Sequence, residues 1–239
     1  MNAYIKPLMS NYLKKLDQKL LNSGFNCPLL LMTSGGTLTN ISSACNNPVR
    51  LVESGPAGGA ILATSIAEDM NLNKVISFDM GGTTAKITII ENKKAIKARE
   101  FEVDRKARFK KGSGYPLRIP VIEMVEIGAG GGSIARVNKL EQIITGPDSA
   151  GSFPGPACYS NGGSMPTITD ADLVIGKINP DNFAGGKIKL SKQLADKAIT
   201  ENIVKFVNID TNVAALAISE IVDETMSNAA RVHTVEQGH

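Results

Sequence analysis

The segment from Lys74 to Ala95 places two runs of strand-forming residues on either side of a pair of glycines. The first run contains the apolar residues Val75, Ile76 and Phe78, and the second, Lys86–Ile90, alternates and is rich in β-branched side chains. Gly81 and Gly82 interrupt the pattern between them. The segment therefore predicts strand, turn, strand. A dinucleotide-binding glycine loop would have to open into a helix, and the chain contains no GxxxxGK[ST] phosphate loop.

The turn carries residues suited to holding a phosphate. We expect an aspartate at the end of a buried strand, where its charge needs a partner such as Mg²⁺. The glycines lift the Cβ restriction, so that backbone N–H groups can converge on an anion, while threonine hydroxyls and a lysine add donors. A plain β-hairpin is the alternative. The candidate residues are Asp79, Gly81, Gly82, Thr83, Thr84 and Lys86.

A second glycine-rich segment follows the apolar-rich stretch Ile119–Ile127. Its bare backbone could admit a ligand or another strand closely, or it could form a tight packing turn. Glu123 and Glu126 lie just upstream and point to opposite faces if that stretch is extended. The candidate ligand-contacting residues are Gly128, Gly130, Gly131, Gly132 and Ser133.

Two carboxylates and a cysteine stand near the end of the glycine-rich region. Asp170 and Asp172 share a face if their segment is a strand, but Asp170 is better explained as the cap of a helix starting near Ala171. Cys158 is expected to be buried rather than nucleophilic, because both histidines, His233 and His239, stand at the far end of the sequence.

Periodicity and composition divide the chain into three parts within an α/β class. Residues 1–111 predict an α/β lobe that begins with a helix over Tyr4–Leu21 and includes a small-residue helix capped by Ser54. Residues 112–190 are dense in glycine and proline, which predicts turns. Residues 191–239 return to helical periodicity.

Composition is that of an ordinary globular protein: 239 residues, 42% hydrophobic, 21% charged and a net charge of +3. The basic run Arg105–Lys111 interleaves one aromatic residue and predicts a solvated surface rather than a nucleic-acid site. Three scattered cysteines provide no disulfide framework or metal knuckle. No apolar run is long enough for a membrane span, and the first residues lack the apolar stretch of a signal peptide, so a cytoplasmic location is expected.

Seven segments together resemble the hydantoinase A/oxoprolinase family, which includes N-methylhydantoinase A, 5-oxoprolinase and the related subunit of acetone-type carboxylases. The resemblance runs across nearly the whole chain in the expected order, which is more specific than any single glycine motif. The segments are PLLLMTSGG, NPVRLVESGPAGGAI, FDMGGTTA, EIGAGGGSIARV, GPDSAGSFPGPACY, PTITDADLVIGKINPDNF and MSNAARVHTVEQGH.

The resemblance implies an actin/hexokinase-like (ASKHA) ATPase fold carrying a glycine-rich inserted β segment. It implies that ATP phosphorylates a cyclic amide such as hydantoin or 5-oxoproline, that the ring then opens, and that a B-type subunit assists. Asp79 would lie near Mg²⁺. Many relatives have an aspartate and a histidine where this chain has Glu123 and Glu126, so a metal held there would be a hard, oxygen-seeking ion.

Family members also have a first phosphate hairpin and a later adenosine-contacting segment, neither of which this sequence contains. It resembles the middle third of the family, so we expect little or no turnover from this chain alone and self-association through an uncovered apolar surface. Two alternatives to an ATP-dependent cyclic amidohydrolase stay open. The chain could belong to a carboxylase subunit of the acetone carboxylase type, or it could be a non-catalytic domain that binds a ligand or partner.

Overall fold

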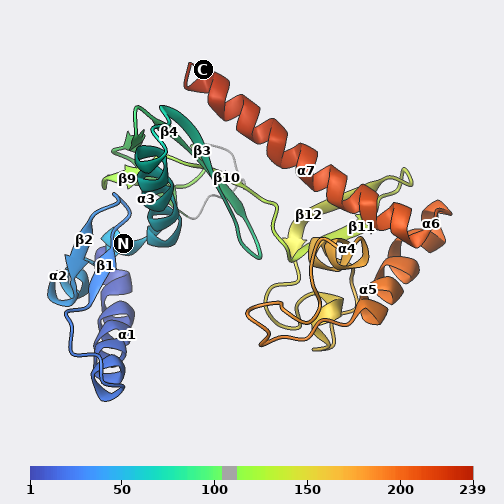
Figure 1. Ribbon diagram of the computed structural model, residues 1–239, viewed down its shortest axis with the longest axis horizontal. Coiled ribbons are helices and arrows are strands. Elements are labelled where there is room, and N and C mark those ends of the chain that lie inside the picture. Colours follow the sequence, from blue (N-terminus) through green and yellow to red (C-terminus); the bar gives the residue numbers. More distant parts are fainter. Residues whose placement is uncertain (104–111, 239) are drawn as a thin grey trace. The chain divides into compact units, whose positions relative to one another are not determined.

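The structure is a computed structural model that describes residues 1–103 and 112–238, drawn in Figure 1. The predicted basic run Arg105–Lys111 lies outside the described residues. The chain forms two compact units. Unit 1 comprises residues 1–79 and 87–124, and unit 2 comprises residues 80–86 and 125–239. These boundaries differ from the three composition-based parts, because a short hairpin tip from the first part of the chain belongs to unit 2.

The mixed α/β class is confirmed, and most elements of unit 1 are short. Strands β3 and β4 extend from unit 1 into the hairpin tip of unit 2. The elements in chain order are α1 (Asn2–Asn22), β1 (Leu30–Met32), β2 (Leu38–Asn40), α2 (Ile41–Asn46), the 3-10 helix η1 (Pro48–Leu51), α3 (Ser54–Asp69), β3 (Lys74–Met80), β4 (Ala85–Glu91), β5 (Lys94–Ala95), β6 (Lys97–Ala98), β7 (Phe101–Val103), β8 (Tyr115–Leu117) and β9 (Val121–Ile122).

The predicted first helix is confirmed as α1, which packs against α2 and η1. Its expected apolar face is only partly buried: Leu13 is enclosed, whereas Leu8 and Tyr12 are exposed. After α1 in the chain, β1 and β2 pair as an antiparallel hairpin. Its turn contains Gly36 at φ +76°, a conformation that favours glycine.

Helix α3 forms the centre of a small core in unit 1. Its buried Ala57 and Ala60 pack with Ile122 of β9. The cap predicted at Ser54 is displaced by one residue, because Glu53 adopts the left-handed conformation and Ser54 is already helical. The small residues on α3 allow this close approach of helix and strand.

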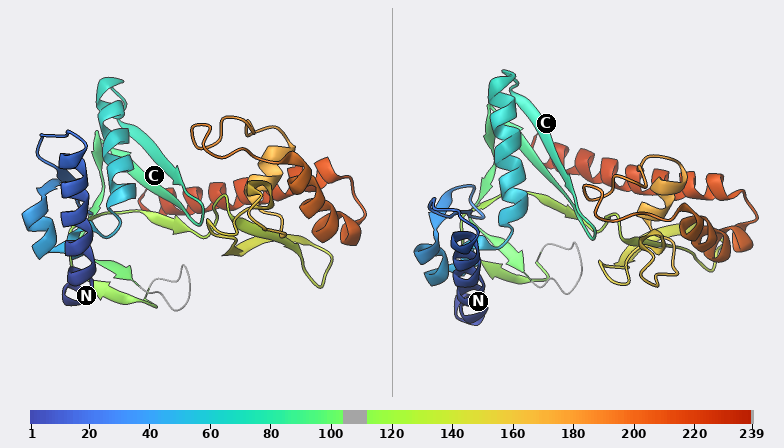
Figure 2. Two further views of the ribbon diagram at one scale, coloured as in Figure 1. Left: turned by 90° about the horizontal axis from the view of Figure 1, so that it is seen from below. Right: turned by 60° about the horizontal axis from the view of Figure 1, so that its bottom comes forward.

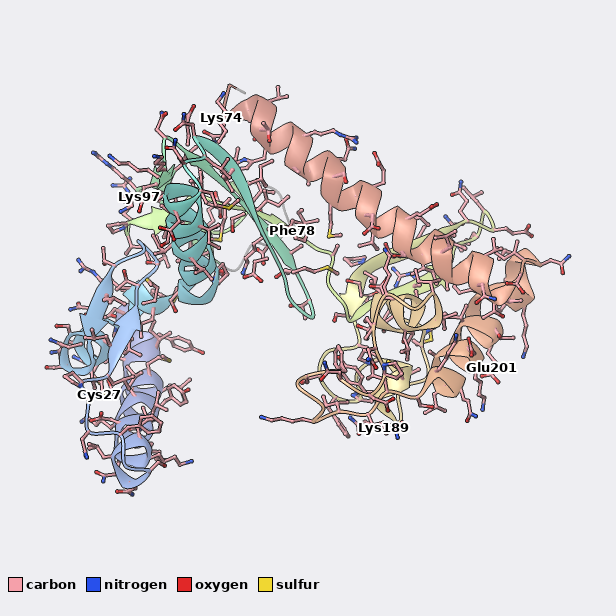
Figure 3. All side chains as sticks on the ribbon, in the orientation of Figure 1. Cys27, Lys74, Phe78, Lys97, Lys189 and Glu201 are labelled. Atoms are coloured by element: carbon pink, nitrogen blue, oxygen red, sulfur yellow. The ribbon has the colours of Figure 1, made fainter. Side chains whose placement is uncertain are left out.

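The sheet that carries the hairpin has the order β10-β4-β3, with β5 also paired to β4. Strand β4 is central and largely buried, whereas β3 is an edge strand. On β3 the side chains of Ile76, Phe78 and Met80 are exposed (Phe78 is labelled in Figure 3). The expectation that Asp79 ends a buried strand is therefore wrong, because this strand has a neighbour on one side only.

Unit 2 is built from a β-hairpin and a group of helices that pack on a long terminal helix (Figures 1 and 2). Helices α4 and α5 pack against each other and against α7, which also contacts β12 and β10. The elements are β10 (Val125–Ile127), β11 (Ser133–Val137), β12 (Ile143–Ser149), the 3-10 helix η2 (Ala157–Tyr159), α4 (Ile168–Val174), α5 (Lys192–Ile199), the π-helix η3 (Thr200–Val204), α6 (Lys205–Val207) and α7 (Thr211–Glu236).

The predicted helical C-terminal part is confirmed, and its core comes from one face of α7. Ala214, Ile218 and Val222 of α7 are fully buried, together with Ile199 and Ile203. Among the described residues, no helix is both long enough and apolar enough to cross a membrane.

Candidate functional site

The predicted strand–turn–strand at the glycine pair is confirmed, and its tip lies in unit 2. Strand β3 ends at Met80 and β4 begins at Ala85. The N–H of Gly81 donates to the carbonyl oxygen of Thr84 over 2.9 Å, which closes the turn. The tip therefore consists of Gly81, Gly82, Thr83 and Thr84, four of the residues predicted to hold a phosphate.

The second glycine-rich segment packs directly on this tip. The N–H of Gly131 donates to the Gly81 carbonyl over 3.0 Å, and the N–H of Gly132 donates to the Gly82 carbonyl over 2.7 Å. Two glycine motifs separated by about fifty residues in sequence thus meet in unit 2 through their backbones. The structure brings together Gly81, Gly82 and the loop from Gly130 to Ser133.

The loop approaches so closely that only glycine fits. A Cβ atom built on Gly130 would lie 2.6 Å from the Thr83 nitrogen, and one built on Gly132 would lie 2.9 Å from the Gly82 carbonyl oxygen. Both neighbours are backbone atoms, which cannot turn aside as a flexible side chain would. The bare backbone predicted for this segment is therefore used to contact the hairpin.

The backbone groups of the two motifs are used in opposite ways. In the loop, the Gly130 N–H donates to the Ser133 hydroxyl over 3.0 Å, and the Ser133 N–H donates to the Gly130 carbonyl over 2.9 Å. With Gly131 and Gly132 bound to the hairpin, four successive loop N–H groups are engaged. In the hairpin, by contrast, the loop engages the carbonyls of Gly81 and Gly82, and the N–H groups that follow Gly81 stay open.

Those following N–H groups belong to Gly82, Thr83 and Thr84. Across residues 1–103 and 112–238, none of the three donates a hydrogen bond to another protein group. All three residues are at least partly exposed to solvent. Successive N–H groups left open on a glycine turn form a concavity suited to an anion. The hairpin offers these donors, and the loop holds the hairpin in place.

Residues that sequence reasoning missed anchor the loop from behind. Thr169 donates through both its hydroxyl, over 2.8 Å, and its N–H, over 2.9 Å, to the carbonyl of Gly131. The Ala150 N–H donates to the Gly132 carbonyl over 2.8 Å. A Cβ on Gly131 would lie 2.8 Å from the Thr169 hydroxyl. The TITDAD segment stands out in the sequence for its two carboxylates, whereas Thr169, directly before the first of them, carries no signal of its own.

The predicted metal residues do not form one described cluster. Asp79 is exposed, and Glu126 lies 3.9 Å from the ammonium of Lys86 in an ion pair. Within the part of the chain that the structure describes, no three Asp, Glu, His or Cys side chains are grouped as metal ligands. The assignment of Asp79, Glu123 and Glu126 to a metal stays a prediction. Within the described residues, Gly128 makes no hydrogen bond to the hairpin tip, and its assignment to the ligand also stays a prediction.

Asp170 is a fully buried carboxylate that ties three segments together. It accepts hydrogen bonds from the N–H groups of Ala157 (3.2 Å), Cys158 (2.7 Å) and Thr167 (2.8 Å), and from the Thr167 hydroxyl (2.8 Å). Thr167 is the N-cap of α4, and Asp170 is the third helical residue of a capping box. The expected helix start near Ala171 is therefore wrong by three residues, because Thr167 supplies the cap.

Asp172 on the same helix links α4 to α7. Its carboxylate accepts a hydrogen bond from the Ser219 hydroxyl over 2.9 Å. The ammonium nitrogen of Lys177 lies 4.0 Å from the same carboxylate. Burial raises the pKa of the Asp172 carboxyl, while Ser219 and Lys177 act in the opposite direction. Lys177 also donates to Asp223 over 3.1 Å. Both carboxylates of this segment are thus explained by helix capping and helix packing.

The prediction that Cys158 is buried is confirmed. Burial raises the pKa of its thiol strongly, and the neighbouring carboxylate of Asp170 raises it further. A raised thiol pKa means that the thiolate, which is the nucleophilic form, is scarce at neutral and mildly alkaline pH. Cys158 therefore has the properties of a packing residue.

We expect a thiol reagent such as DTNB at pH 8 to label Cys27 rapidly and Cys158 only after unfolding. Cys27 is exposed, whereas Cys158 is buried and burial raises the pKa of its thiol, so the reagent reaches Cys158 poorly and finds little thiolate there. Peptide mapping of samples quenched over time would measure each rate. A Cys27→Ser variant removes the fast reaction and serves as the control. Rapid labelling of Cys158 in the native chain would contradict its buried position.

Comparisons with known proteins find one family across the whole chain. The family model described as hydantoinase/oxoprolinase matches residues 1–239. An uncharacterized protein of Methanocaldococcus jannaschii is 44% identical over 241 residues, which cover 100% of this chain and 35% of that protein. The caprolactamase subunit alpha of Pseudomonas jessenii is 32% identical over 238 residues, covering 100% of this chain and 33% of the subunit.

Two solved structures share the fold. The nucleotide-free structure of acetone carboxylase, an enzyme of ATP-dependent acetone carboxylation, matches with a TM-score of 0.81 and 27% identity, over 95% of this chain and 31% of that one. The crystal structure of the ATP-dependent caprolactamase from Pseudomonas jessenii matches with a TM-score of 0.72 and 32% identity, over 100% of this chain and 33% of that one. The chain thus spans about a third of the length of these relatives.

Proposed function

This chain belongs to the hydantoinase/oxoprolinase family, and we propose that it forms the central, phosphate-binding part of an ATP-dependent enzyme that opens a cyclic amide. In the proposed reaction the amide oxygen of a hydantoin or 5-oxoproline-like ring attacks the γ-phosphorus of ATP and ADP leaves. Water then attacks the activated ring carbon and the ring C–N bond breaks, with the ring nitrogen taking up a proton, which leaves an acyl phosphate. A second water hydrolyses the acyl phosphate and releases phosphate. The proposed fold is the actin/hexokinase-like (ASKHA) type.

The observation that carries this proposal is the set of open N–H groups at Gly82, Thr83 and Thr84. Phosphoryl transfer depends on positioning and on stabilising charge more than on covalent chemistry by the protein. Donors that are fixed before the ligand arrives need no reorganisation, and the buttressing loop from Gly130 to Gly132 fixes these ones. The loop amides are engaged, so we assign them to positioning the hairpin rather than to binding phosphate.

We propose that Asp79 and Lys86 supply the charges at this hairpin. Mg²⁺ in nucleotide sites is usually held by one or two carboxylates together with phosphate oxygens and water, and the exposed Asp79 suits that role. When bound, the ion would neutralise charge that develops on the phosphates. Lys86 stands two residues beyond the turn and pairs with Glu126 at 3.9 Å.

A second candidate function is supported by the structural similarity to acetone carboxylase, which has a TM-score of 0.81 at 27% identity. In that case the phosphorylated substrate would be a ketone or bicarbonate. We propose that either enzyme works with a further subunit of the B type, because the relative from Pseudomonas jessenii is a subunit alpha. ATP turnover that requires bicarbonate would favour the carboxylase, and turnover driven by a lactam or hydantoin alone would favour the hydrolase.

The test is a titration of the chain with Mg²⁺-ADP and Mg²⁺-ATP, in which NMR monitors the backbone amide signals. We expect saturable shifts at Gly82, Thr83 and Thr84, because these N–H groups would begin to donate to phosphate. Asp79→Ala should weaken the effect of the Mg²⁺ complex, and Lys139→Gln, an exposed lysine of unit 2, is the charge control. Shifts confined to other residues, or their absence for both nucleotides, would exclude this hairpin as the phosphate site.

A further inference from the structure

A small polar pocket in unit 1 is not explained by the proposed reaction. It has a volume of about 170 Å³ and is lined by Thr33, Ser34, Gly35, Thr37, Arg50, Lys97 and Pro120. All of these residues belong to unit 1. They come from the turn after β1, from η1, from β6 and from the residue before β9. Four separate segments thus contribute to it, and two of them bring a cation (Lys97 is labelled in Figure 3).

Ser34 fixes the geometry of this pocket. Its N–H donates to the Arg50 carbonyl over 2.7 Å, and its hydroxyl donates to the Pro120 carbonyl over 3.0 Å. Its own carbonyl accepts from the N–H of Ile122 over 2.8 Å. Ser34 is 2% exposed, so these bonds are shielded from water. One residue therefore ties the turn to η1 and to the start of β9.

The turn leaves donors for a ligand. A hydroxyl carries one proton, and that of Ser34 is already directed to Pro120. The Thr33 and Thr37 hydroxyls share one hydrogen bond of 2.9 Å, so one of their two protons is available. Gly35 is buried, and within the described residues its N–H donates no hydrogen bond. A buried donor of this kind is stabilised when an acceptor enters the pocket.

The charges of the lining are all positive. Neither Arg50 nor Lys97 has a carboxylate within ion-pair distance among the residues that the structure describes. A guanidinium presents a planar fork of N–H donors that matches two oxygens of a carboxylate or phosphate. The ammonium of Lys97 adds a second point charge. The lining lacks a carboxylate, which excludes a cation as its natural occupant.

We propose that this pocket is a binding site for a small oxyanion, the carboxylate or phosphate group of a ligand. Arg50 and Lys97 provide charge, and the Gly35 N–H and a threonine hydroxyl provide directed hydrogen bonds. Its volume lies below the roughly 300–1,000 Å³ typical of pockets for drug-sized ligands, so it suits one anionic group rather than a nucleotide. The site is distinct from the hairpin, since none of the hairpin residues lines it.

The experiment uses the full 239-residue chain and three probes: sodium phosphate, sodium acetate and sodium chloride at matched ionic strength. Amide NMR follows Gly35 and its neighbours, and the dissociation constant is fitted from the shifts. Arg50→Gln and Lys97→Gln should each weaken binding about fivefold, since each removes one charge-assisted contact, and the double variant should weaken it further than either single change. Lys94→Gln removes an equal charge from β5 outside the pocket and should leave the constant unchanged.

The outcomes separate the ligand types and can overturn the proposal. Tighter binding of phosphate than of acetate identifies a phosphate site, and equal or tighter binding of acetate identifies a carboxylate site. Equal shifts with chloride, or equal affinities in the wild type and the double variant, would show general salt binding and refute the pocket. Shifts at Gly82 or Thr83 instead of Gly35 would assign the anion to the hairpin. Thermal unfolding of each variant checks that the exposed substitutions leave the fold intact.

Discussion

Substituting alanine for Gly130 is expected to lower the midpoint of thermal unfolding by about 5–10 °C and to remove the nucleotide response of the hairpin. The new Cβ would lie 2.6 Å from the Thr83 nitrogen and 2.7 Å from the Gly82 carbonyl carbon. Backbone must move to relieve such a clash, at a cost of roughly 2–3 kcal/mol. The displacement would also break the hydrogen bonds from Gly131 and Gly132 that hold the tip.

Gly82→Ala provides the matched control for stability. It makes the same chemical change in the partner motif, but a Cβ there meets no atom within 4 Å. Its unfolding midpoint should therefore remain close to that of the wild type. Differential scanning calorimetry of the two variants gives the comparison directly. Equal midpoints for Gly130→Ala and Gly82→Ala would show that the loop is not packed on the hairpin as described.

The second large effect is expected from Asp170→Asn, which should destabilise the chain by about 3 kcal/mol. The carboxylate accepts four hydrogen bonds from N–H and O–H donors and donates none. An amide of the same shape turns an NH₂ group toward at least one of these donors. Because the site is fully buried, water cannot replace the lost bond. Denaturant unfolding followed by circular dichroism measures the change.

The control for Asp170→Asn is Asp148→Asn. Asp148 is exposed and makes an ion pair with Arg136 at 2.7 Å, a contact worth at most about 1 kcal/mol on a surface. The Asp170 variant should also label more rapidly at Cys158, because the segment carrying the thiol is held by that carboxylate. Unfolding of both variants at the same denaturant concentration would refute the structural role of Asp170.

Local pattern was sufficient for most of the fold. The helix α1, the strands β3 and β4 and the helix α7 follow from periodicity, since each contains enough alternating or helical repeats to be recognised. Burial was harder to predict. Whether β3 lies at an edge depends on where further strands join the hairpin, and the distant strand β10 pairs with the other side of β4 rather than with β3. The exposure of Asp79 could not be deduced from its own segment.

The site was predicted in part. Consecutive glycines in the sequence predicted both the hairpin tip and the glycine-rich loop. Glycine is needed there because the two backbones approach each other too closely for a Cβ atom. Their division of roles depends on hydrogen-bond partners that lie far apart in sequence: Gly131 is 50 residues from Gly81, and Thr169 is 38 residues from Gly131. A threonine that anchors a loop looks like any other threonine in the sequence. Only the structure distinguishes the amides that bind the hairpin from those left open.

The division of the chain into residues 1–79 with 87–124 and residues 80–86 with 125–239 has a consequence for folding order and for protein engineering. Neither unit is formed by one continuous stretch of sequence. A cut after residue 124 would therefore remove from the second unit residues 80–86, the hairpin tip that binds its glycine-rich loop. During synthesis the hairpin tip emerges well before the loop that receives it. Its docking therefore waits for later sequence, which makes this contact a late, non-local step in assembly.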